Sequence, residues 1–256
     1  MVTWLRFQHS GESCFGKLDG DSIAVCNGNM FVDPAETGES LAFTDVTIDV
    51  PCWPSKIIAL WNNSRSAAEK QGLDMPAEPL FFIKASNTCL PSGGVIRKPA
   101  SYDGRVIYEA ELGVVVGQEC TKLSLADAEA AIFGYTCVND VTALQILKED
   151  ESFAQWARAK GFDTFGPIGP VIAADVDISN SIIRAELNGR ERQNYSVSDL
   201  FMGPAELLSR ISHFMTLYPG DIISCGTGPG ALPMQPGAKI DVIIDGIGTL
   251  SNTYET

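Results

Sequence analysis

The ten residues from Tyr108 to Gly117 constrain this chain more than any other stretch, because a strand of buried character begins there with two acidic side chains. The β-branched run from Val114 to Val116 is typical of a buried strand. Side chains alternate along a strand, so Glu109 and Glu111 point to the same face, with Cα atoms about 6.6 Å apart at a rise of about 3.3 Å per residue. Two buried carboxylates this close need a positive partner unless they are protonated.

A divalent cation is the simplest such partner, and a basic side chain from elsewhere is the second. A structural interpretation stays open as well, in which one glutamate points inward and the other outward, or both lie on the surface beside a lysine. Asp140 favours the cation. It follows the apolar run from Ile132 to Val138, which predicts a second buried strand. Its alternative role is to cap a helix that we expect to begin there.

Three carboxylates from two strands would form a cation site made of oxygen atoms. Glu109, Glu111 and Asp140 are the predicted ligands, and the other coordination positions would be left to water and substrate. Oxygen ligands indicate Mg²⁺ or Mn²⁺, with Ca²⁺ as an alternative, and argue against zinc.

Composition limits the class of protein. The 256 residues, 45% of them hydrophobic, can bury a sizeable core. We expect a cytoplasmic protein that binds no membrane, because no run approaches about 18 apolar residues and the N-terminus does not resemble a signal peptide. The net charge of −14 argues against a nucleic-acid partner. The seven cysteines are scattered singly, which predicts reduced thiols in place of a zinc site or disulfides.

Short apolar segments separated by turns predict a mainly β fold in two parts. Residues 1–50 form a small β-rich N-terminal appendage with hairpin turns at Asp19-Gly20 and Asn27-Gly28, and residues 51–256 form the main domain. The absence of a regular strand–helix alternation argues against a Rossmann fold or a TIM barrel. A helix predicted over residues 204–215 places His213 at its surface or end, and with only two histidines a histidine-based hydrolytic triad is not expected.

Four blocks of this sequence resemble the fumarylacetoacetate hydrolase family. They are Glu109-x-Glu111, Asn139-Asp140-Val141-Thr142, the run from Lys160 to Pro170, and the run from Thr216 to Asp221. The resemblance extends from Trp53 to the C-terminus. It implies an α+β, mainly β fold, a β-roll with short helices outside, and a homodimer.

The same resemblance implies a lid near the metal. In relatives a lid helix carries a histidine and a glutamate that handle the proton of water; here Ser66 stands at the histidine position and Glu69 is kept. Glu69 is therefore the predicted catalytic residue of the lid, although the departure at Ser66 weakens the case for water activation. Arg65 is a candidate for binding a substrate carboxylate when the lid closes. For both residues the alternative is a solvated position on an exposed helix.

Three further residues are assigned to the site. Lys160 is a predicted catalytic residue, because an ammonium group beside the cation lowers the negative potential and can donate to a substrate oxygen or a ligand carboxylate. Its alternative is a lysine that complements a helix C-terminus. By resemblance, Lys84 and Thr227 are implied to bind substrate, whereas Leu144-Gln145 stands where relatives often have an Arg-Asp pair.

These residues predict a divalent-metal-dependent enzyme for small anionic 2-oxo or 2,4-dioxo acids. A dication can chelate the carboxylate and the 2-oxo oxygen and stabilise an enolate. Hydrolytic C–C cleavage of an acylpyruvate or fumarylacetoacetate-like substrate, in aromatic catabolism, is the first hypothesis. The alternative is a decarboxylase or isomerase of oxaloacetate-like or hydroxyheptadienedioate-like diacids. A non-catalytic protein with a structural ion is a minor alternative, since structural sites usually take their ligands from one compact loop.

Overall fold

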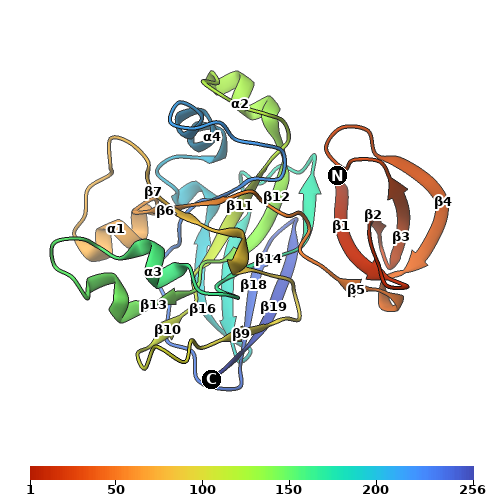
Figure 1. Ribbon diagram of the computed structural model, residues 1–256. Helices are drawn as coiled ribbons and strands as arrows, with labels where there is room; N and C mark the ends of the chain where they lie inside the picture. The colour runs from red at the N-terminus through yellow and green to blue at the C-terminus, as the bar shows by residue number, and fades with distance from the viewer.

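Figure 1 shows the computed structural model, which describes all residues from Met1 to Thr256: a β-rich body carries short helices on its outside, with a lobe of N-terminal strands at one side. The mainly β fold predicted from the sequence is confirmed. None of its helices has the length and apolar character that a membrane span needs.

The largest sheet contains twelve strands and joins the N-terminal lobe to the body. Strand β1 pairs antiparallel with β14, where Trp4 lies opposite Ile172. Two short strands, β5 (Thr47–Ile48) and β8 (Cys89–Leu90), pair with β1 and β14. The other ten, in order across the sheet, are β4 (Ala35–Ala42), β3 (Ser22–Asn27), β2 (Glu12–Asp19), β1 (Val2–His9), β14 (Gly166–Ala174), β12 (Ile132–Asn139), β11 (Ala110–Val116), β17 (Ile222–Ser224), β6 (Ile57–Trp61) and β7 (Leu80–Lys84).

A second sheet packs against the middle of the first. Strands β15, β18 and β19 contact β11, β12 and β14 of the large sheet. Val114, Ala185 and Val242 belong to the larger of two apolar clusters, and burial of such apolar surface is the main source of stability. The strands of the second sheet, in order, are β16 (Arg190–Ser196), β15 (Ile182–Leu187), β18 (Ala238–Ile244), β19 (Gly248–Glu255) and β9 (Val95–Arg97).

The helices are short and lie outside the sheets (Figure 1). Helices α2 and α4 contact each other, and His213 is the exposed residue after α4, as predicted. The four α-helices are α1 (Arg65–Gln71), α2 (Leu125–Ala131), α3 (Trp156–Lys160) and α4 (Pro204–Ser212). The four 3₁₀ helices are η1 (Phe43–Asp45), η2 (Ser86–Thr88), η3 (Leu144–Lys148) and η4 (Val197–Asp199).

The prediction of a helix beginning at Asp140 is wrong. The next residues form strand β13 (Thr142–Ala143), which pairs with β10 (Val106–Ile107), and only then does η3 begin. The backbone groups after Asp140 are thus satisfied across a two-stranded ladder, and Asp140 caps no helix. Its carboxylate is left available to other groups.

Candidate metal centre and active site

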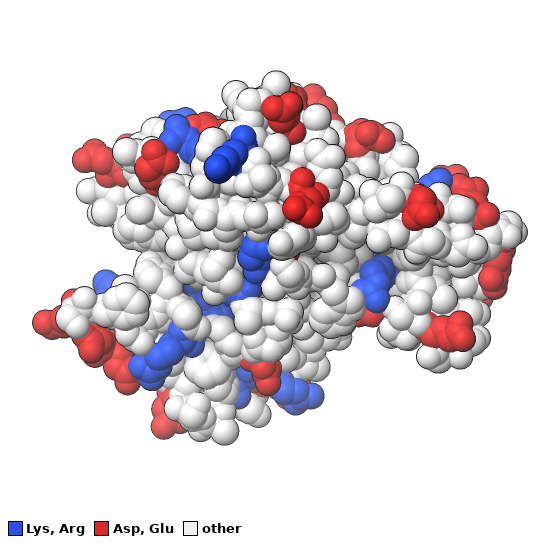
Figure 2. All heavy atoms as spheres, turned by 45° about the horizontal axis from the view of Figure 1, so that its top comes forward, with Lys and Arg blue, Asp and Glu red and all other residues white.

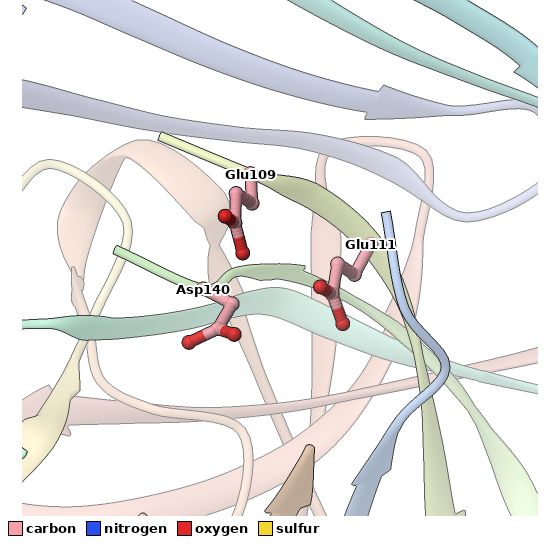
Figure 3. A group of neighbouring side chains, drawn as sticks. All are labelled: Glu109, Glu111 and Asp140. Carbon is pink, nitrogen blue, oxygen red and sulfur yellow. The ribbon is translucent and has the colours of Figure 1, made fainter. Parts of the chain in front are cut away.

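The strand register brings the three predicted carboxylates together. Glu111 lies in β11 and Glu109 directly before it, while Asp140 directly follows β12. Because β11 and β12 are antiparallel neighbours, the backbone N–H of Asp140 donates to the carbonyl of Glu109 at 2.9 Å. One carboxylate oxygen from each residue lies within 4.8 Å of those of the other two. Figure 3 shows the three side chains converging on one point.

Two lysines neutralise part of this acidic cluster. The Lys160 ammonium lies 2.6 Å from Glu109 Oε2 and also donates to Asp140 Oδ2. Lys84 donates to Asp140 Oδ1 at 2.5 Å and to the carbonyl of Phe165 at 2.9 Å. Figure 2 shows basic side chains along the hollow of one face and acidic ones mainly on its outer parts. The protein is acidic as a whole, but basic groups concentrate around this hollow.

Glu111 has no basic partner within 4.0 Å. It is 1% exposed, and its Oε2 accepts hydrogen bonds from the Ser224 hydroxyl at 2.5 Å and the Gly226 N–H at 2.9 Å. Burial, reinforced by the charges of Asp140 and Glu109, raises the pKa of Glu111 to about 8. A carboxyl group buried beside two other acidic side chains, with no basic partner of its own, favours an additional cation at this place.

Asp140 and Lys160 are held in their charged forms. Burial by itself would raise the pKa of Asp140, but Lys160 and Lys84 outweigh it and hold that pKa below its usual value. Burial would also lower the pKa of Lys160, but the charges of Asp140 and Glu109 outweigh it and raise that pKa. Three carboxyl groups thus lie together with two lysines, and the carboxylate oxygens fit an oxygen-binding dication such as Mg²⁺ or Mn²⁺.

A cavity of about 290 Å³ opens above this cluster. Glu109, Glu111 and Lys160 line it, together with residues of α1, β6, β7 and α3 and the loop that follows β17. Thr227 of that loop also lines it; its hydroxyl lies 3.0 Å from the carbonyl of Ala110 and accepts from Gln193 Nε2 at 2.8 Å. Two of the three predicted metal ligands, Glu109 and Glu111, therefore share one small chamber with Lys160 and Thr227.

Comparison with known proteins identifies the family. Residues 56–255 match the family described as "Fumarylacetoacetate (FAA) hydrolase C-terminal", and residues 3–51 match "Rv2993c-like, N-terminal". The chain belongs to the fumarylacetoacetate hydrolase family. Members of this family include hydrolases, isomerases and tautomerases and generally depend on a divalent metal.

Three relatives illustrate that range. The chain is 38% identical to "Oxaloacetate tautomerase YisK" of Bacillus subtilis (strain 168), over 78% of this chain and 69% of the relative. It resembles the crystal structure of "2-hydroxyhepta-2,4-diene-1,7-dioate isomerase from Mycobacterium marinum" at a TM-score of 0.91 and 33% identity, over 100% and 98% of the two chains. A "fumarylpyruvate hydrolase from Pseudomonas aeruginosa in complex with Mn2+ and pyruvate" gives a TM-score of 0.73 at 28% identity, over 80% and 91%.

The lid residues of this fumarylacetoacetate hydrolase family member do not point into the chamber. Glu69 is exposed, and its helix neighbours Ala67, Lys70 and Gln71 line the cavity instead. The guanidinium of Arg65 lies 4.9 Å from the centre of the Phe201 ring. In this conformation neither residue reaches the carboxylates, and their roles on closure stay predictions.

Lys84 also lies outside the chamber. It is 1% exposed, is not among the residues that line the cavity, and donates a hydrogen bond to Asp140. The structure thus gives it a contact with a proposed metal ligand, and its predicted contact with substrate stays a prediction.

Asp199 is a lid anchor that the sequence analysis missed. Its carboxylate accepts from the hydroxyls of Ser64 at 2.6 Å and Ser66 at 2.8 Å, and from the Ser66 N–H at 3.1 Å. Ser64 is also the cap of α1, since its oxygen accepts from the N–H of Ala67. Asp199 follows Ser66 by 133 positions, and no local pattern connects them.

Proposed function

We propose that this protein is a divalent-metal-dependent enzyme that binds a 2-oxo or 2,4-dioxo acid and stabilises its enolate. One observation carries the proposal: the buried Glu111, without a basic partner, lines a cavity together with Glu109 and Lys160, and both glutamates cluster with Asp140. A structural ion would need no such cavity beside it.

The roles of the residues follow from their places. Glu109, Glu111 and Asp140 would hold Mg²⁺ or Mn²⁺, which supplies positive charge to the carboxylate and 2-oxo oxygens of the acid. Lys160 remains charged and presents a donor at the cavity wall where negative charge develops on the substrate. Thr227 lines the cavity from the loop that follows β17, and its hydroxyl donates to the carbonyl of Ala110. The relative described with Mn²⁺ and pyruvate supports this choice of ligand class.

Hydrolytic C–C cleavage of an acylpyruvate is the first candidate reaction. It needs a group that takes a proton from water, and Glu69 is the only carboxylate that α1 could bring over the cavity on closure. The fumarylpyruvate hydrolase supports this candidate.

Enolate chemistry without water, as in tautomerisation, isomerisation or decarboxylation, is the second candidate. One observation favours it: the Ser66 hydroxyl, at the position of the lid histidine, is used in a hydrogen bond to Asp199. Neither His9 nor His213 lines the cavity. The oxaloacetate tautomerase and the isomerase among the relatives support this candidate.

A substrate panel tests the proposal. We expect turnover of at least one compound among acylpyruvates, oxaloacetate and dienoic 2-oxo diacids in the presence of Mn²⁺, and loss of that turnover with a chelator. Release of pyruvate identifies hydrolysis, whereas conversion between keto and enol forms without cleavage identifies tautomerisation. Equal rates with and without the chelator on every compound would contradict the proposal.

We expect Glu69→Gln to slow hydrolysis of an acylpyruvate by about 100-fold, the usual scale for loss of a general base. Mn²⁺ affinity should not change, because Glu69 lies outside the carboxylate cluster. Titration with Mn²⁺ and steady-state kinetics measure the two effects. Full hydrolytic activity in this variant would exclude the lid glutamate from the mechanism.

Ser66→His restores the histidine found in relatives but also breaks the bond to Asp199, so Ser66→Ala is its matched control. A gain of hydrolysis with histidine and not with alanine would show that the native enzyme lacks a water-activating group.

A further inference from the structure

Three aromatic side chains form one wall of the cavity: Trp61 at the end of β6, Phe82 in β7 and Trp156 at the start of α3. The Phe82 and Trp156 rings are stacked, with centroids 5.2 Å apart and an angle of 14° between their planes. Trp61 lies against Trp156 at 5.9 Å and 53°. The wall is thus a contact between three elements, and its rings are held in position.

This wall begins directly beside the reacting centre. The Lys160 ammonium lies 5.1 Å from the centre of the Phe82 ring, and Trp156 and Lys160 are the two ends of the same short helix. A 2-oxo acid held by the metal ligands and Lys160 would therefore place its far end against the rings.

The apolar surface continues beyond the wall. The same three aromatic residues, together with Pro79, Leu80 and Phe81, surround an adjoining hollow of about 410 Å³. Leu80 is 40% exposed and Trp61 37% exposed, so this surface is open to a molecule that extends from the cavity. The distal group of a long substrate could therefore extend along this apolar surface.

The cavity offers little to a second substrate carboxylate. No arginine lines it, and the only lysine besides Lys160 is Lys70, an exposed residue of α1. The Gln145 side chain, on the segment before α3, is already hydrogen-bonded to Tyr102 and to the N–H of Arg105. A carboxylate buried against the aromatic wall would lose its hydration without gaining a buried cationic partner beyond Lys160.

We propose that the enzyme selects 2-oxo acids with a single carboxylate and a flat apolar distal group, aryl or conjugated alkenyl, and that Trp61, Phe82 and Trp156 determine this selectivity. The proposal rests on the proposed function, because the metal ligands and Lys160 must hold the 2-oxo acid end. Flat rings suit the wall because stacked and edge-to-face contacts between aromatic groups are favourable.

The test compares substrates that differ only in the distal group. Hydrolysis of benzoylpyruvate by water gives benzoate and pyruvate, and that of acetylpyruvate gives acetate and pyruvate; for tautomerisation the pair is phenylpyruvate and oxaloacetate. With Mn²⁺, we expect kcat/KM to favour the aryl member of either pair by about 10- to 100-fold, the scale of discrimination in apolar pockets. A preference for oxaloacetate, or equal use of both acylpyruvates, would overturn this inference and leave the proposed function intact.

Two variants assign the selectivity to the wall. Trp156→Leu and Trp61→Leu should each reduce the ratio of kcat/KM values between aryl and methyl substrates. Trp53→Leu is the matched control, since Trp53 is 55% exposed and lies outside the cavity lining. An unchanged ratio in both cavity variants would overturn the assignment.

A binding measurement separates this inference from the proposed function. Phenylpyruvate and pyruvate are titrated in the presence of Mn²⁺ while tryptophan fluorescence is recorded. Tighter binding of phenylpyruvate that is lost in Trp156→Leu, without turnover of any acid, would support the aromatic site and contradict the enzyme proposal. Equal binding of the two acids without turnover would contradict both.

Discussion

Glu111→Gln is expected to abolish metal-dependent turnover, with Mn²⁺ affinity lowered by at least about 100-fold, while the fold is retained. Loss of one of three carboxylate ligands removes both a charge and a donor from the site. Glutamine has nearly the same shape, and its side-chain oxygen can still accept from Ser224 and Gly226. Calorimetric titration with Mn²⁺ and steady-state kinetics measure the two losses.

The same variant should be more stable than the native protein when no metal is present and the pH is high. The pKa of Glu111 in the folded protein, about 8, lies above its ordinary value of 4.5. Such a group favours folding most below pH 4.5, and its contribution is lost as the pH rises towards 8. Between pH 5 and pH 9, the Tm of metal-free Glu111→Gln should therefore decrease less than the Tm of the metal-free native protein.

Metal binding should show the opposite dependence on pH. Because the cation requires the ionised carboxylate, Mn²⁺ affinity of the native protein should rise between pH 6 and pH 8. Glu78→Gln, at an exposed carboxylate outside the cluster, is the control for both measurements. Normal Mn²⁺ affinity in Glu111→Gln would remove Glu111 from the ligand set.

The parts of the structure that could be predicted from sequence are those that depend on neighbouring residues. The strands β11 and β12 follow from continuous apolar runs, and the polar stretch after β6 forms a helix, which Ser64 caps. The approach of Glu109, Glu111 and Asp140 could be predicted because each lies at or beside the end of one of two strands that pair directly.

Other features depend on contacts between distant parts of the chain. Lys84 and Asp140 are 56 positions apart and meet only because β7 and β12 belong to the same folded sheet. The aromatic wall similarly combines β6, β7 and α3, and no periodic pattern in any one element indicates it. The direction of Glu69 could not be predicted, because α1 is short and polar and its orientation is determined by the distant Asp199.

The helix expected after Asp140 fails for a related reason. An aspartate that follows a strand is a good helix cap. Aspartate also ends strands in cases where the residues after it pair with a different strand. Here Thr142 pairs with Ile107, and this tertiary pairing outweighs the local preference.

Lys160→Met should lower kcat by about 100- to 1,000-fold at saturating Mn²⁺, the scale observed when one charge-stabilising donor is removed from an active site. Methionine has a similar length and no charge, so the packing against Phe82 is largely kept. In the metal-free protein, however, Glu109 and Asp140 lose the ammonium group between them. The variant should therefore unfold more easily without metal and bind Mn²⁺ more tightly than the native protein, because the site carries one more uncompensated negative charge.

Lys84→Met separates the two roles of Lys160. Both lysines bond to Asp140, but only Lys160 lines the cavity. Lys84→Met should destabilise the protein at least as much as Lys160→Met does, since Lys84 is buried. If Lys160 acts on the substrate directly, kcat of Lys84→Met should nevertheless stay within about tenfold of the native value at saturating Mn²⁺. If kcat falls equally in the two variants, both lysines act through the position and charge of Asp140. Lys160 would then be a positioning residue for a metal ligand and would make no catalytic contact with the substrate.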